Sequence, residues 1–172
     1  MQNIYGELTF VCPSYWMSQA YSGSGRSSYR YQYSIVPALH GNDVVGYFGP
    51  PSNVQGPDFV KAFMNIYGNF VTRDNPSINS TLAFGANANS SDSQQDNVAG
   101  NWPEFSPSTP YQINLNQTGG TPSTMEYLGS NVTILTGDSL RNDFSKVNAY
   151  TWEGGRGRRC DYWRSIHNLL PN

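Results

Sequence analysis

The chain has 172 residues, a length that suits one domain, with 37% hydrophobic and only 13% charged residues and a net charge of −2. The small net charge favours no nucleic acid or other polyanionic partner, and no hydrophobic run approaches the roughly 18 residues that a membrane span requires. A low charge with much Ser, Asn, Gly and Tyr is typical of a secreted protein. Because the opening residues do not form a signal peptide, we expect any export signal to lie upstream.

The first elements predicted along the chain are a helix and a strand. Pro13 suits the first position of a helix that holds Tyr15 and Trp16, and the Ser-Gly stretch at 22–25 ends this helix. Residues 29–35 alternate aromatic and polar side chains with a period of two. This pattern predicts a strand whose aromatic face meets a core.

A histidine follows this strand on a turn. The Val-Pro dipeptide at the strand end is expected to be extended, to carry the chain off the strand tip and to place His40 and Gly41 in the loop beyond. Asn42 and Asp43 are predicted to cap a short helix at 44–48. An imidazole on such a loop is suited to proton transfer, although position alone favours a structural loop histidine.

The clearest helix begins at Pro57 and Asp58. Its apolar residues are spaced as on one helical face, which predicts a core-facing stripe of Phe59, Phe63, Ile66, Tyr67 and Phe70.

The remaining chain is poor in apolar residues. Residues 77–125 are expected to be mostly irregular and exposed, with an exposed loop at 86–100, because such a composition buries little apolar surface. Short strands are predicted at 112–116 and 132–135, and a terminal helix at 161–170 is expected to be anchored by Trp163 and Leu169.

Five segments, taken together, resemble one protein family. They are HGNDVVGYFG at 40–49, LTFVCPSYWMSQ at 8–19, the amphipathic segment at 59–76, NWP at 101–103 and RCDYWR at 159–164. In type and order they resemble segments of the type-B carboxylesterase and lipase family, the cholinesterase-like branch of the α/β-hydrolases, and especially its secreted fungal-type carboxylesterases. The segment at 40–49 resembles that family's histidine motif, and the five together extend nearly from end to end.

This resemblance implies an α/β fold, namely the C-terminal portion of an α/β-hydrolase fold with its last strands, histidine loop and flanking helices, incomplete as a stand-alone domain. It implies an ester hydrolase without cofactor or metal. In that enzyme His40 is the general base of a Ser-His-acid triad, and Gly41 and Asp43 are positioning residues, Asp43 as a helix cap.

Two of the three catalytic groups are absent from this sequence. It contains no Gly-x-Ser-x-Gly nucleophile motif, and the only acidic residue before His40 is Glu7, which we expect on the surface. We therefore expect the ester substrate to be cleaved only together with the remaining N-terminal part of the hydrolase, and this chain alone to be inactive.

Cys12 and Cys160 are, from their spacing alone, as well explained by two buried thiols as by a disulfide. The resemblance implies the bridge, because both positions match the last disulfide of cholinesterase-like enzymes, and it implies a secreted glycoprotein. Four sequons fit the glycosylation rule without being enriched over chance. They begin at Asn79, Asn89, Asn116 and Asn131.

Three other motifs receive a structural interpretation. The block Gly-Asp-Ser-Leu around Ser139 matches the motif of the GDSL hydrolases, in which the serine is a nucleophile near the start of the catalytic domain. Here the block lies late in the chain, so we expect Ser139 in a turn or helix cap. The single arginine-glycine segment at 154–159 is expected to be a solvated turn rather than an RNA-binding element. His167 lacks a partner at metal-ligand spacing, so no metal site is predicted.

Two alternatives to a hydrolase part stay open. One is a non-catalytic binding or adhesion protein of the same family, although such a domain has no need of a base at position 40. The other is a truncated, non-functional product, since without a central sheet the aromatic faces of Tyr31 and Phe63 would be exposed.

Overall fold

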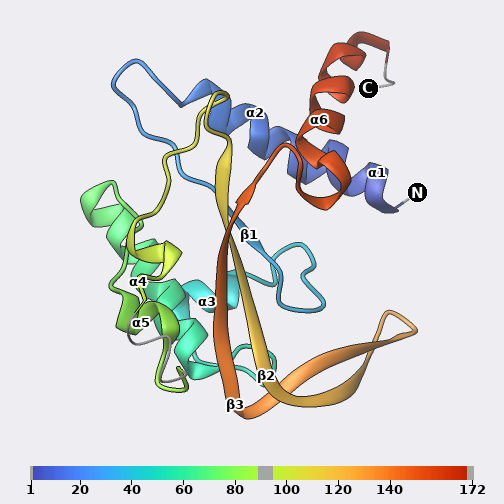
Figure 1. Ribbon diagram of the computed structural model, residues 1–172. Helices are drawn as coiled ribbons and strands as arrows, with labels where there is room; N and C mark the ends of the chain where they lie inside the picture. Colours follow the sequence, from blue (N-terminus) through green and yellow to red (C-terminus); the bar gives the residue numbers. More distant parts are fainter. Residues whose placement is uncertain (1, 89–94, 170–172) are drawn as a thin grey trace. The chain divides into compact units, whose positions relative to one another are not determined.

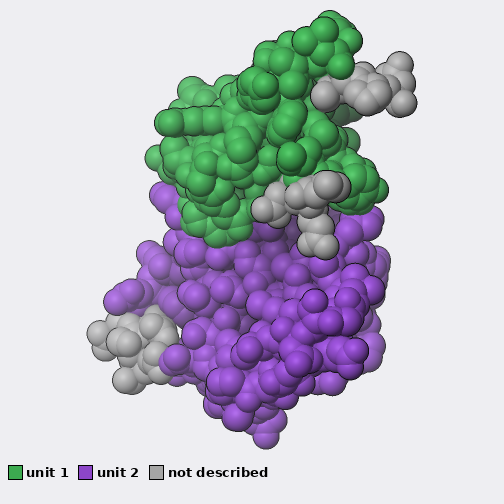
Figure 2. Space-filling model, turned by 90° about the vertical axis from the view of Figure 1, so that its right-hand side faces the viewer, with its two compact units in different colours: residues 1–30, 103–112, 147–172 green, residues 31–102, 113–146 purple. Residues whose placement is uncertain are grey.

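The structure is a computed structural model that describes residues 2–88 and 95–169. The described chain combines helices with a three-stranded mixed sheet (Figure 1), so the expected mixture of α and β structure is present. It divides into two compact units (Figure 2). Unit 1 consists of residues 1–30, 103–112 and 147–172, and unit 2 of residues 31–102 and 113–146.

Unit 1 is built around helices from both ends of the chain. These are α1 (Gln2–Gly6), the π-helix η1 (Glu7–Val11), α2 (Cys12–Ala20), α6 (Trp152–Ser165) and the 3-10 helix η4 (His167–Leu169). Pro13 lies in the first turn of α2, as predicted. The core draws on all three segments of the unit and comprises Cys12, Tyr15, Phe105, Ala149 and Cys160.

The terminal helix differs from the prediction in two respects. It begins at Trp152 rather than 161, with left-handed residues at 153–155 before the regular helix, so the arginine-glycine segment is largely helical rather than a turn. Trp163 packs against the core of unit 1, but Leu169 is 81% exposed and anchors nothing. The expected anchoring by Leu169 was therefore wrong.

The sheet, most of which belongs to unit 2, begins with the predicted strand. Strand β1 (Tyr31–Tyr33) is shorter than the expected 29–35 and runs parallel to the start of β2 (Tyr111–Tyr127), with Tyr31 opposite Ile113 and Tyr33 opposite Leu115. A two-residue turn then joins β2 to β3 (Ser130–Asn148), which makes this pair antiparallel. Both turn residues, Leu128 and Gly129, are left-handed, as a type I′ turn requires.

Helix α4 (Pro57–Arg73) provides much of the core of unit 2, and the predicted start at Pro57 is confirmed. Phe59, Phe63 and Ile66 are buried as expected, but Tyr67 and Phe70, farther along the stripe, are exposed. The short helix α3 (Val44–Phe48), also predicted, contacts α4. The prediction of a core-facing stripe is therefore right for the first half of α4 and wrong for its end.

The described residues of the segment 77–125, namely 77–88 and 95–125, are more ordered than expected. They contain α5 (Ser80–Phe84), the 3-10 helix η3 (Val98–Gly100) and most of β2. Side-chain caps explain the two helices, since Asn79 accepts from the Leu82 N–H and Asn97 from the Ala99 N–H. The strands also extend far beyond the predicted pieces at 112–116 and 132–135, because each pairs with the other along the hairpin. The part of the expected loop at 89–94 lies outside the described residues.

Candidate functional site

The predicted histidine lies on a turn just past the end of β1. The chain between β1 and α3 makes two turns. The first is closed by a hydrogen bond from the Ala38 N–H to the Ile35 carbonyl (2.8 Å), and the second by one from the Asn42 N–H to the Leu39 carbonyl (3.0 Å). His40 lies within the second turn, and its side chain is exposed. The arrangement of strand, turn with histidine and short helix is the one predicted from the sequence.

Gly41 has a backbone reason to be glycine. Its φ of +84° is left-handed, and a Cβ there would meet no atom within 4 Å, so conformation rather than space excludes a side chain. The left-handed backbone lets the chain turn directly after His40, and the Val44 N–H then bonds to the Gly41 carbonyl at 3.2 Å.

Asp43 does not have the predicted capping role. It occupies the residue before α3, but its side chain makes no cap hydrogen bond. Its Oδ2 instead accepts hydrogen bonds from the Tyr31 hydroxyl (2.7 Å) and the Tyr47 hydroxyl (2.6 Å), and the two hydroxyls also contact each other. The packing of β1 and α3 brings both phenols to the carboxylate, and these bonds replace a local bond to the helix backbone.

Both tyrosines remain donors over the physiological pH range. Burial raises the pKa of Tyr31 well above its usual value of 10.0, and its hydrogen bond with Tyr47 and the charge of Asp43 raise this pKa further. Burial also raises the pKa of Tyr47, and the hydrogen bond with Asp43 adds to the effect. Each phenol therefore keeps the proton that it donates to the carboxylate.

Gln55, which sequence reasoning missed, also binds the turn that carries His40. It is 1% exposed, and its Nε2 donates to the Tyr33 hydroxyl (2.7 Å) and to the Asn42 carbonyl (2.8 Å). The Asn42 side chain in turn accepts from the Leu39 N–H at 2.8 Å. No sequence signal marks a glutamine in a Pro-Ser-Gly loop as buried, so only the structure identifies it.

Two hollows in the structure are lined by other residues. One, of about 470 Å³, lies in unit 1 between the start of α6 and Tyr162. The other, of about 360 Å³, lies in unit 2 and is lined by Gly119, Gly120, Ser139 and others. Ser139 lies within β3, so the expected turn or cap was wrong, because strand pairing extends through this block.

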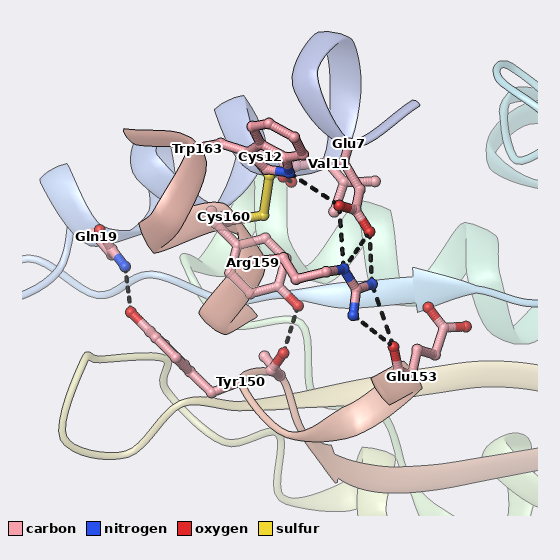
Figure 3. The surroundings of a disulfide bond; sticks show 12 residues. Glu7, Val11, Cys12, Gln19, Tyr150, Glu153, Arg159, Cys160 and Trp163 are labelled. Atoms are coloured by element: carbon pink, nitrogen blue, oxygen red, sulfur yellow. Dashed lines mark hydrogen bonds and ion pairs between the residues drawn. A yellow bond between two sulfur atoms is a disulfide. The ribbon is translucent and has the colours of Figure 1, made fainter. Parts of the chain in front are cut away.

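Cys12 and Cys160 form a disulfide, buried in the core of unit 1 (Figure 3). Glu7 lies beside it and is only 6% exposed, so the expected surface position was wrong. Its carboxylate accepts from Arg159 Nη2 (2.6 Å) and from the Trp163 indole (3.2 Å), and the bonds from Arg159 lower the pKa of Glu7. These partners lie more than 150 residues away in sequence, which is why the local pattern suggested a surface residue.

The four sequons differ in their surroundings. Asn131 is exposed directly after the hairpin turn, and Asn79 is exposed while its side chain caps α5. Asn116 lies half-buried within β2, and Asn89 lies outside the described residues. Accessibility therefore favours Asn131 and Asn79 as acceptors over Asn116.

In the part of the chain that the structure describes, His, Cys, Asp and Glu side chains form no group of three or more that could hold a metal ion. The same residues contain no helix that is long and apolar enough to cross a membrane. Comparisons with protein-family models, with curated proteins and with solved structures found no match.

Proposed function

We propose that this chain supplies the general base, His40, of a serine carboxylic-ester hydrolase that resembles the type-B carboxylesterase and lipase family. The nucleophilic serine and the triad acid would come from a polypeptide segment outside these 172 residues. The observation that carries the proposal is the HGNDVVGYFG segment on a turn that follows a strand and precedes a short helix. The exposed His40 side chain is accessible to groups from such a segment.

The chemistry follows from the two nitrogens of an imidazole. As a serine attacks the ester carbonyl, one ring nitrogen of His40 takes the serine proton while a carboxylate holds the other nitrogen. His40 then gives this proton to the departing alcohol. In the second half-reaction it removes a proton from the water that attacks the acyl-enzyme and returns this proton to the serine oxygen as the carboxylic acid leaves. An imidazole serves both transfers because it gains and loses a proton near neutral pH.

The disulfide supports an extracellular location for such an enzyme. Bridges of this kind form and persist in oxidising compartments, and Cys12–Cys160 is buried within a helical core. The exposed sequons at Asn79 and Asn131 agree with a secreted glycoprotein.

The test uses the complete reading frame that contains this sequence, assayed with p-nitrophenyl acetate and butyrate. We expect His40→Ala to lower kcat by several orders of magnitude. The matched control is His167→Ala, at the other of the two histidines, which lies in η4 with Nδ1 at 2.8 Å from the Arg164 carbonyl. Equal turnover by the His40→Ala variant and the parent would refute the proposal.

A second measurement separates the enzyme from the adhesion alternative. A fluorophosphonate probe should label a serine in the complete protein and leave the 172-residue chain unlabelled. Labelling of this chain by itself, or ester turnover by it, would contradict an external nucleophile. A complete protein that neither reacts with the probe nor cleaves esters would favour a binding protein.

A further inference from the structure

The polar groups around Asp43 converge on the turn that carries His40. We name Asp43, Tyr31, Tyr47 and Gln55 the turn clamp. Tyr31 lies in β1, Asp43 directly precedes α3, Tyr47 lies in α3, and Gln55 lies in the loop before α4. All four belong to unit 2. We propose that the turn clamp consists of positioning residues that fix the His40 imidazole for proton transfer. This inference rests on the proposed function and assigns to Asp43 a role other than helix capping.

The first argument is that the clamp holds the chain directly after His40. Asp43 is fixed by two phenol hydroxyls at 2.7 and 2.6 Å, and the Asn42 carbonyl is fixed by Gln55 at 2.8 Å. Through its side chain Asn42 also binds the Leu39 N–H, on the other side of His40. Leu39 is therefore tied to Asn42 within the turn, and Asn42 and Asp43 are tied to neighbouring elements.

The second argument is that the clamp is itself held by the core. The Tyr31 and Tyr47 rings pack against Phe63 with centroid distances of 5.3 and 4.8 Å, and Phe63 is 1% exposed. Edge-to-face packing of this kind restricts where each hydroxyl can lie. The buried Phe63 ring of α4 thus restricts the two hydroxyls, and through them the Asp43 carboxylate at the end of the His40 turn.

The third argument concerns the free energy that is required to bury polar groups. Placing a carboxylate and a glutamine amide in partly or fully buried positions requires desolvation that apolar residues would avoid. The Gln55 Nε2 group makes two hydrogen bonds, while its Oε1 has no hydrogen-bond partner among the described residues. Polar groups that have their hydrogen bonds, as the Asp43 carboxylate has from both tyrosines, specify one geometry sharply. A precise geometry next to the imidazole is what proton transfer requires.

The experiment measures kcat and KM for the complete hydrolase, with kcat expressed per active site titrated by a fluorophosphonate. Titration restricts the comparison to folded, reactive molecules. We expect the double variant Tyr31→Phe with Tyr47→Phe, and separately Asp43→Leu, to lower kcat by roughly 10- to 100-fold with KM nearly unchanged. The matched control is Tyr67→Phe, which removes a hydroxyl from a ring that stacks on Tyr47 but is not bonded to Asp43.

A conservative variant separates positioning from charge. Asp43→Asn keeps an oxygen that accepts a tyrosine hydrogen bond, so we expect it to restore much of the kcat lost in Asp43→Leu, with an unchanged pH–rate profile. If Asp43→Asn is as slow as Asp43→Leu, or shifts the pH–rate profile, Asp43 acts through its charge and the positioning role is refuted.

The outcomes also distinguish the two proposals. If His40→Ala keeps full activity, the proposed function fails. If His40→Ala is inactive while Asp43→Leu and the double tyrosine variant keep kcat within about twofold of the parent, the turn clamp alone is refuted.

Discussion

Replacing both Cys12 and Cys160 with alanine is expected to lower the free energy of unfolding of the complete protein that contains this chain by roughly 5 kcal/mol. The magnitude follows from the sequence separation of 148 between the two cysteines. Closing a loop of that length reduces the entropy of the unfolded chain by an amount worth roughly 5 kcal/mol at 25 °C. Loss of two buried sulfur atoms from the core of unit 1 adds a smaller packing term in the same direction.

Urea unfolding followed by tryptophan fluorescence measures this loss. Trp16 and Trp163 pack against the core that contains the bridge, so they report on unfolding of unit 1. With a slope of about 2 kcal/mol per molar urea, a loss of 5 kcal/mol lowers the unfolding midpoint by roughly 2.5 M. A reducing agent should lower the midpoint of the parent chain similarly and leave the double variant unchanged. A double variant within about 1 kcal/mol of the oxidised parent would refute the loop-entropy reasoning.

Two further predictions each concern one contact. Glu7→Gln should cost about 1 to 3 kcal/mol near neutral pH, because Arg159 and Trp163 bind the buried carboxylate. The fold lowers the pKa of Glu7 from its usual value of 4.5. The stabilisation is therefore present above pH 4.5 and is lost as the pH falls through the pKa that Glu7 has in the folded chain. Urea unfolding at a series of pH values measures this loss. Gly46→Ala should lower stability in thermal melts by about 1 to 3 kcal/mol, because the added Cβ would lie 2.6 Å from the Phe63 ring.

Each of these predictions has a matched control. Glu104→Gln changes an exposed carboxylate that accepts from the Ser27 hydroxyl, and its effect should stay within about 0.5 kcal/mol at every pH. A cost of Glu7→Gln that does not vary with pH would contradict a role for the charge. Gly68→Ala in α4 meets no atom within 4 Å and should stabilise by up to about 1 kcal/mol. If Gly46→Ala stabilises as well, the Phe63 ring can move and the packing argument fails.

The elements predicted correctly are those that short stretches of sequence determine. Helix α4 begins at Pro57 because proline suits the first turn of a helix, and its first half carries a buried apolar face. The turn of His40 was predictable for a similar reason, since Gly41 supplies the left-handed residue that the turn requires. The disulfide was predicted through the family resemblance, whereas spacing alone left two buried thiols equally open.

The hairpin of β2 and β3 was largely missed because its order comes from pairing between strands. Its residues include many Ser, Thr, Asn and Gly, which locally favour turns. Gly119 and Gly120 would suggest a loop, yet both lie within β2 with positive φ. A Cβ at Gly119 would lie 2.5 Å from the Ser139 carbonyl oxygen, so glycine there permits close approach of the paired strand.

The errors at Asp43 and Glu7 have a common physical cause. Local rules assign an acidic residue to a helix cap or to the surface, because they do not consider which side chains the fold brings to the carboxylate. In the folded chain Asp43 is bound by Tyr31 and Tyr47, and Glu7 by side chains more than 150 residues away. Charge-assisted hydrogen bonds to such partners outweigh a single capping bond or full hydration. Sequence therefore points to the imidazole that is proposed to react, whose motif is contiguous, while the groups proposed to orient it emerge only once β1, α3 and the loop before α4 pack together.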